Sequence, residues 1–109
     1  MNYSFSGHVF KRMAERGFSP ETIKSVIENG RVIKDYPDDT PYPSRLILGF
    51  EEKRPVHVVS AYNAENDTEY VITVYEPDVQ KWSNNFTERR WKWSVLFVDS
   101  AKWKMVLPK

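Results

Sequence analysis

The first thirty residues carry apolar side chains at helical spacing. Four of them fall on or beside one side of a helix: Val9, Phe10, Met13 and Ala14. Ser6 precedes them as an N-cap that can accept a main-chain hydrogen bond, and Gly17 follows at the position where glycine ends many helices. The pattern predicts a helix of about ten residues.

A second helix is predicted directly after the first. The stretch Ser19-Pro20-Glu21 is a second helix-start signal, with a serine cap, a proline at the first helical position and an acid in the first turn. An apolar stripe follows: Ile23, Val26 and Ile27. The stripe ends before Gly30, and only the stretch GFS separates the two helices, so we expect a tight helical pair.

From Arg31 onward the apolar positions change to the alternation typical of strands. Four strands are predicted: Arg31–Lys34, Arg45–Phe50, Val56–Tyr62 and Glu69–Tyr75. An acidic loop with three prolines, DYPDDTPYPS, separates the first two, and short turn-rich stretches separate the others. We therefore expect an α+β fold, with two N-terminal helices packed on a four-stranded antiparallel sheet. The stretch SVLFVDS leaves open a fifth strand or a small helix.

The last two predicted strands are expected to form a hairpin. If Tyr62 pairs with Tyr70, then His57 lies directly opposite Tyr75. In an antiparallel pair, moving five residues back along one strand corresponds to moving five residues forward along the other. This register places two titratable side chains next to each other.

Length and composition indicate one compact domain, since 109 residues with 40% hydrophobic side chains suffice for a core. The sequence has no cysteine, which excludes disulfides, thiolate zinc sites and cysteine nucleophiles and suits a reducing compartment. The start MNYSFSGHVF lacks the features of a signal peptide, and the apolar runs are too short to cross a membrane. We expect a cytoplasmic protein with no membrane partner.

Common cofactor and metal motifs are missing from the sequence. It contains no glycine-rich phosphate loop, no metal-binding pair of histidines and no GxSxG motif. Three acids in the proline-rich loop, Asp35, Asp38 and Asp39, are typical of exposed turns rather than of an ion site. We expect no cofactor and no metal, so a hydrolytic mechanism would have to use the two histidines.

The charge is distributed unevenly along the chain. Residues 1–80 carry nine Lys/Arg and thirteen Asp/Glu, whereas residues 81–109 carry seven and two and contain all four tryptophans. Cations between aromatic rings are typical of nucleic-acid binding, and Lys81, Arg89 and Arg90 are candidates for phosphate contacts. The alternative is that the tryptophans pack on the domain. We expect a domain over residues 1–82 and a basic extension, 83–109, that packs on it.

Three polar residues of the first helix follow one another at four-residue intervals: His8, Arg12 and Arg16. This spacing places them along the border of the apolar stripe. If the helix crosses the strand face that carries His57 and Tyr75, all five side chains line one groove. The alternatives are a surface network of ion pairs on the helix and a satisfied core histidine in the strand.

Five stretches of the chain occur in an order typical of a known family: FSGHVFKRMAERGFS, YPDD, PYPSRLILG, RPVHVV and ITVYEPDVQKW. Over residues 4–82 the sequence resembles the DUF4258 family of small bacterial and archaeal proteins. The resemblance implies a fold similar to the RelE/ParE toxins, with two N-terminal helices on an antiparallel sheet. Several members of that superfamily are metal-independent ribonucleases of toxin–antitoxin systems, and others poison gyrase.

Metal-free RNA cleavage needs a base for the 2′-OH, cations around the phosphorus and an acid for the leaving oxygen. The resemblance therefore implies a toxin-like metal-independent endoribonuclease. Three residues are the catalytic candidates, His8, His57 and Tyr75, and two bind phosphate, Arg12 and Arg16. RNA and an antitoxin protein are the expected partners, and a homodimer is left open. The alternatives are a non-catalytic RNA- or protein-binding module and a toxin acting on another target, such as a topoisomerase.

Overall fold

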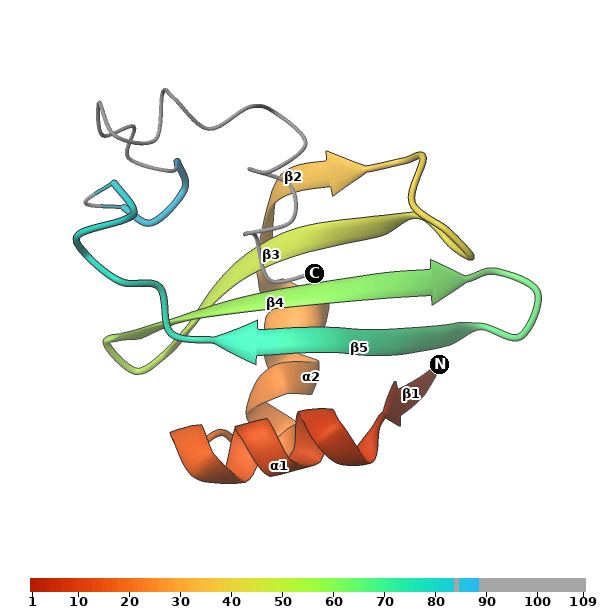
Figure 1. Ribbon diagram of the computed structural model, residues 1–109, viewed down its shortest axis with the longest axis horizontal. Coiled ribbons are helices and arrows are strands. Elements are labelled where there is room, and N and C mark those ends of the chain that lie inside the picture. Colours follow the sequence, from red (N-terminus) through yellow and green to blue (C-terminus); the bar gives the residue numbers. More distant parts are fainter. Residues whose placement is uncertain (84, 89–109) are drawn as a thin grey trace.

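Two helices and a five-stranded sheet make up the structure, a computed structural model that describes residues 1–83 and 85–88 (Figure 1). The strands lie in the order β1-β5-β4-β3-β2. Along the chain the elements are β1 (Asn2–Phe5), α1 (Gly7–Arg16), α2 (Pro20–Asn29), β2 (Arg31–Tyr36), β3 (Ser44–Glu51), β4 (Arg54–Asn63) and β5 (Thr68–Tyr75). The predicted α+β fold is confirmed.

Both helices begin and end at the predicted signals. The Ser6 hydroxyl accepts the Val9 N–H at 3.1 Å, and Gly17 ends α1 with φ 73°, a left-handed conformation that glycine adopts without steric cost. In α2 the Ser19 hydroxyl accepts the Thr22 N–H at 3.2 Å. No described helix is long and apolar enough to cross a membrane.

Strand β1 was not predicted from the sequence. It pairs with β5 in parallel, from Asn2 opposite Thr68 to Phe5 opposite Val71, so the sheet is mixed and not wholly antiparallel. Strand β1 has only four residues before the helix cap at Ser6, which are too few to show alternating polar and apolar positions. Their strand conformation is therefore fixed by a partner more than sixty residues away.

The β4–β5 hairpin has the predicted pairing at one end only. His57 lies opposite Tyr75 and Val59 opposite Thr73, as expected. Nearer the turn Tyr62 pairs with Glu69 instead of Tyr70, because a β-bulge after Val59 shifts the register by one residue.

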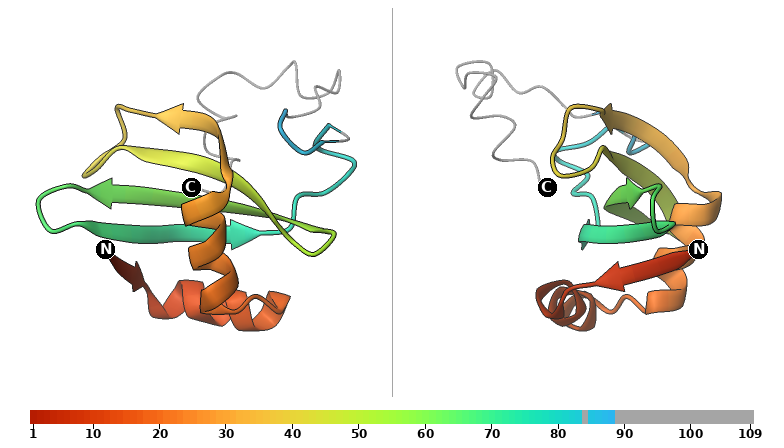
Figure 2. Two further views of the ribbon diagram at one scale, coloured as in Figure 1. Left: turned by 180° about the vertical axis from the view of Figure 1, so that it is seen from behind. Right: turned by 90° about the vertical axis from the view of Figure 1, so that its right-hand side faces the viewer.

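The two faces of the sheet carry separate hydrophobic clusters. On one face, Val56 and Val58 pack with apolar residues of both helices, and Figure 2 (left) shows α2 crossing in front of the strands. On the other face, Leu46 and Val59 pack against Trp82 from the segment after β5. We call residues 77–83 and 85–88 the cover segment, because they bury part of the helix-free face.

Candidate functional site

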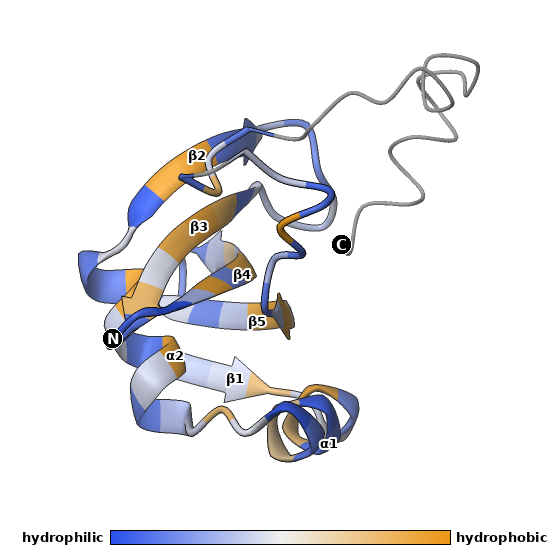
Figure 3. Ribbon diagram, turned by 90° about the vertical axis from the view of Figure 1, so that its left-hand side faces the viewer, coloured by the Kyte–Doolittle hydropathy of each residue, from blue (hydrophilic) through white to orange (hydrophobic). Residues whose placement is uncertain are grey.

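The single groove expected from the sequence is not formed. His57 points to the helix-free face and is 0% exposed, whereas its strand neighbours Val56 and Val58 pack under the helices. His8 and Arg12 are exposed on α1, which lies next to β1 at one edge of the sheet (Figure 3). The buried residues of α1 belong to the same cluster as Val56 and Val58. Because successive side chains of a strand point to opposite faces, His57 cannot share a surface with α1 while those valines do. The prediction of one shared groove is therefore wrong.

Arg16 has a structural contact rather than an open phosphate-binding position. Its guanidinium donates a 2.5 Å hydrogen bond to the main-chain oxygen of Val74 and is partly buried. This bond joins the last turn of α1 to β5. Of the five groups expected to meet, His57 and Tyr75 do contact each other.

His57 and Tyr75 form a hydrogen-bonded pair under the cover segment. The Nδ1 atom of His57 lies 3.0 Å from the Tyr75 hydroxyl, and its Nε2 atom lies 2.9 Å from the main-chain oxygen of Phe86. A carbonyl oxygen can only accept, so Nε2 carries the proton and donates. In the neutral ring Nδ1 then accepts from the Tyr75 hydroxyl, which fixes the tautomer and occupies both nitrogens.

Burial also fixes the charge state of His57. Removal from water lowers its pKa from 6.5 to about 4, although the hydrogen bond to Phe86 acts in the opposite direction. The Trp82 ring packs edge-on against the imidazole at 4.4 Å between ring centroids. His57 is therefore neutral at pH 7, and in this arrangement neither nitrogen can exchange a proton with a substrate.

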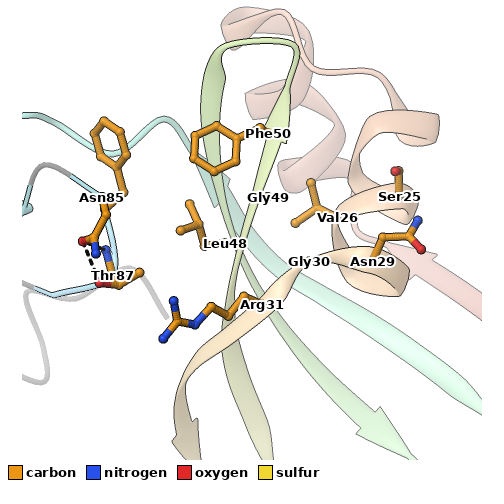
Figure 4. Close-up of a pocket in the computed structure, with 11 residues that line it drawn as sticks. Ser25, Val26, Asn29, Gly30, Arg31, Leu48, Gly49, Phe50, Asn85 and Thr87 are labelled. Atoms are coloured by element: carbon orange, nitrogen blue, oxygen red, sulfur yellow. Dashed lines mark hydrogen bonds between the residues drawn. The ribbon is translucent and has the colours of Figure 1, made fainter.

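A groove of about 570 Å³ lies beside this pair, at the edge of β3 (Figure 4). Its volume is within the roughly 300–1,000 Å³ common for ligand pockets. Leu48 and Phe50 lie between Asn85 and Thr87 on one side and α2 on the other. The lining comes from three parts of the chain: Ser25, Val26, Asn29, Gly30, Arg31, Leu48, Gly49, Phe50, Asn85, Phe86 and Thr87.

The groove exists because β2 is shorter than β3 at this end. The pairing of β2 with β3 begins at Arg31 opposite Leu48, so Gly49–Glu51 have no partner in β2. The end of α2 and the cover segment flank this unpaired stretch. The groove could not be predicted from the local sequence, because its walls come from different elements of the chain.

The side chains in the groove suit a planar ring with polar edges and an attached anion. Phe50 is 55% exposed, and its ring meets that of Phe86 edge-on at 6.4 Å. Arg31 is the one charged residue among the described lining residues. Polar side chains also border the groove: Asn29, Asn85, Ser25 and Thr87. The Asn85 side-chain oxygen already accepts from the Thr87 hydroxyl at 2.7 Å, so Asn85 offers a ligand its N–H donors.

The remaining predicted contacts are only partly covered by the structure. Lys81 is exposed. Its neighbour Trp82 is buried and packs on the domain, which agrees with the alternative interpretation of the tryptophans. Arg89, Arg90 and the stretch SVLFVDS lie outside the described residues. Within residues 1–83 and 85–88, no group of acids and histidines is arranged to hold a metal ion.

Taken together, the fold is a small α+β domain with a mixed sheet, a groove at a strand edge and a buried His–Tyr pair. The sequence model of a family described as "Domain of unknown function (DUF4258)" matches residues 5–76. The chain belongs to this family. No curated protein and no solved structure shows significant similarity to it.

Proposed function

We propose that this protein is a toxin-like RNA-binding module that holds one unpaired base of single-stranded RNA in the groove at the β3 edge. The observation that carries the proposal is the exposed Phe50 ring next to Arg31 and two side-chain amides. An aromatic face stacks on any base, and a guanidinium binds phosphate through two hydrogen bonds. Amides can then bind the polar edge of the base.

A single strand suits this groove better than a duplex. Bases in a duplex present only their edges, whereas an unpaired base offers both its face and its pairing edge. Arg31 is the one cation among the described residues of the groove, so further phosphate contacts must come from elsewhere. The sequence after residue 80 supplies seven basic and two acidic residues, which suits the backbone of a longer strand.

Binding is supported better than cleavage, because no described group in the groove is a proton-transfer residue. His57 is the nearest candidate, and both of its nitrogens are occupied. His8 and Arg12 are exposed on α1, whose buried residues pack in the cluster of Val56 and Val58 and not on the face to which His57 points. A stacking platform needs neither an acid nor a base.

Fluorescence anisotropy with a labelled twelve-nucleotide RNA tests the proposal. Phe50→Ala and Arg31→Ala should each weaken binding by roughly 5- to 100-fold, the range expected when one stacking or phosphate contact is lost. Matched controls are Phe10→Ala, an exposed ring on α1, and Lys34→Ala, an exposed cation on the same strand as Arg31. Equal affinity of the four variants would contradict the groove as the binding site. Tighter binding of DNA of the same sequence would contradict RNA as the ligand.

Metal-independent endoribonuclease activity is a second candidate, favoured by the 3.0 Å contact between His57 and Tyr75. An imidazole and a phenol are suitable for the two proton transfers, provided that the cover segment moves away. Incubation with RNA in EDTA tests this: His57→Ala should abolish cleavage, while His8→Ala and Arg12→Ala should keep it. No cleavage by the unaltered protein would leave RNA binding as the function.

A further inference from the structure

Phe86 belongs both to the groove and to the buried His57–Tyr75 pair. Its ring lines the groove and contacts Phe50 edge-on. Its main-chain oxygen accepts the Nε2–H of His57 at 2.9 Å. A ligand that displaces the main chain of Phe86 together with its ring would also move the atom that holds His57.

The backbone of Phe86 has an unfavourable conformation. Its φ is 61°, in the left-handed region, where a large side chain is unfavourable. The surrounding loop holds it there through short local bonds: the Phe86 N–H donates to the Ser83 oxygen at 2.9 Å, and Asn85 accepts from the Thr87 hydroxyl at 2.7 Å. Strain of this kind persists only while its surroundings enforce it, and it is often found at switching positions.

An unpaired base can take the place of the Phe86 ring. Both are flat and aromatic, and the exposed Phe50 offers a base a stacking surface where Phe86 makes only an edge contact. Once the ring leaves, Phe86 can relax to negative φ. Its oxygen then turns away from His57 and opens one side of the imidazole to water.

We propose that Phe86 is a latch that couples the groove to the His57–Tyr75 pair: an RNA base entering the groove displaces Phe86 and uncovers His57. This inference rests on the proposed function and names its regulation. In the free protein His57 is locked and neutral. With RNA bound, its Nε2–H is free to reach solvent or the bound strand.

The latch is tested by NMR of histidine labelled with ¹⁵N, because the chain has only two histidines. In the free protein the Nε2–H of His57 should exchange slowly with water. Saturation with the twelve-nucleotide RNA should speed this exchange by at least 10-fold. His8, exposed on α1, is the internal reference for effects that do not involve the latch.

Two variants of Phe86 test the latch further, and the first of them does not depend on RNA. Proline cannot adopt positive φ and has no N–H to donate, so Phe86→Pro should give fast exchange at His57 in the free protein. Glycine adopts positive φ without strain and has no ring to displace, so Phe86→Gly should keep exchange slow and reduce the effect of RNA to less than two-fold. The unchanged spectrum of the sheet in both variants shows that the fold is intact.

The outcomes separate the two proposals. RNA binding without faster exchange at His57 would overturn the latch and leave the RNA-binding function standing. Slow exchange in Phe86→Pro would also overturn the latch. A lack of RNA binding by the unaltered protein would overturn the proposed function and, with it, RNA as the trigger.

Discussion

His57 shows how strongly its surroundings decide what one residue can do. In an exposed position a histidine changes charge near neutral pH and is suited to proton transfer. Here burial lowers its pKa to about 4, and its hydrogen bonds to Tyr75 and Phe86 use both nitrogens. The residue that the sequence favours most for catalysis is thus a neutral part of the packed interior while the cover segment is in place.

The lowered pKa of His57 predicts a loss of stability in acid. Since its folded pKa is below the unfolded value of 6.5, the unfolded chain binds the proton more readily as the pH falls from 6.5 toward 4. Between pH 7.5 and pH 5.0 the free energy of unfolding should therefore fall by about 2 kcal/mol on account of this residue. Urea denaturation at the two pH values measures it.

The matched variant for this prediction is His57→Gln, which keeps a donor and an acceptor but does not titrate. It should lack the additional acid sensitivity, whereas His8→Gln should show the same pH dependence as the unaltered protein. Equal losses in all three proteins would show that His57 does not cause the effect.

At the scale of elements, the contact between α2 and β3 depends on a glycine. A Cβ atom at Gly49 would lie 2.6 Å from the Cγ2 atom of Val26, closer than real side chains approach each other. Glycine here allows the buried side of α2 to pack directly on the strand backbone. The same close approach brings the end of α2 to the β3 edge, where both line the groove.

Gly49→Ala should therefore destabilise the protein by about 1–3 kcal/mol, the usual cost of overfilling a packed core. Thermal or urea unfolding measures the change. Gly7→Ala is the control, since a Cβ there meets no atom within 4 Å, and it should change stability by less than about 0.5 kcal/mol. In the double variant Val26→Ala/Gly49→Ala, the combined loss should be smaller than the sum of the single losses, because the two closest contacts, with the Cγ atoms of Val26, are removed.

At the scale of the whole molecule, two clusters on opposite faces of one sheet hold the chain together. The helices cover one face, and the cover segment covers part of the other. Trp82 is 5% exposed and provides the largest side chain of the second cluster. The second cluster therefore both stabilises the fold and closes access to His57.

Trp82→Ala should cost about 3–5 kcal/mol of unfolding free energy, as expected for loss of a large buried ring. The same change should raise the pKa of His57 toward its ordinary value, because water then reaches the imidazole. Urea denaturation and an NMR titration of His57 measure the two effects. The adjacent, exposed Lys81→Ala should leave both nearly unchanged, and a Trp82→Ala protein as stable as that control would contradict the role given to this ring.

The sequence by itself determined the features that depend on neighbours along the chain. Ser6, Gly17 and Ser19 define the ends of helices through bonds to residues a few positions away, and these were predicted correctly. The short turn predicts the β4–β5 hairpin itself, whereas His57 lies opposite Tyr75 only because the β-bulge after Val59 shifts the register by one residue. The family resemblance was also readable, since the motifs of residues 5–76 are linear.

Only the tertiary structure decided which face of the sheet the helices cover. Val56 and Val58 on one side of β4, and Val59 and Ala61 on the other, are all apolar, so alternation alone could not assign the faces. The parallel β1–β5 pair and the groove likewise join segments far apart in sequence. Such features result from burying both faces of one sheet at once, and no local pattern encodes that choice.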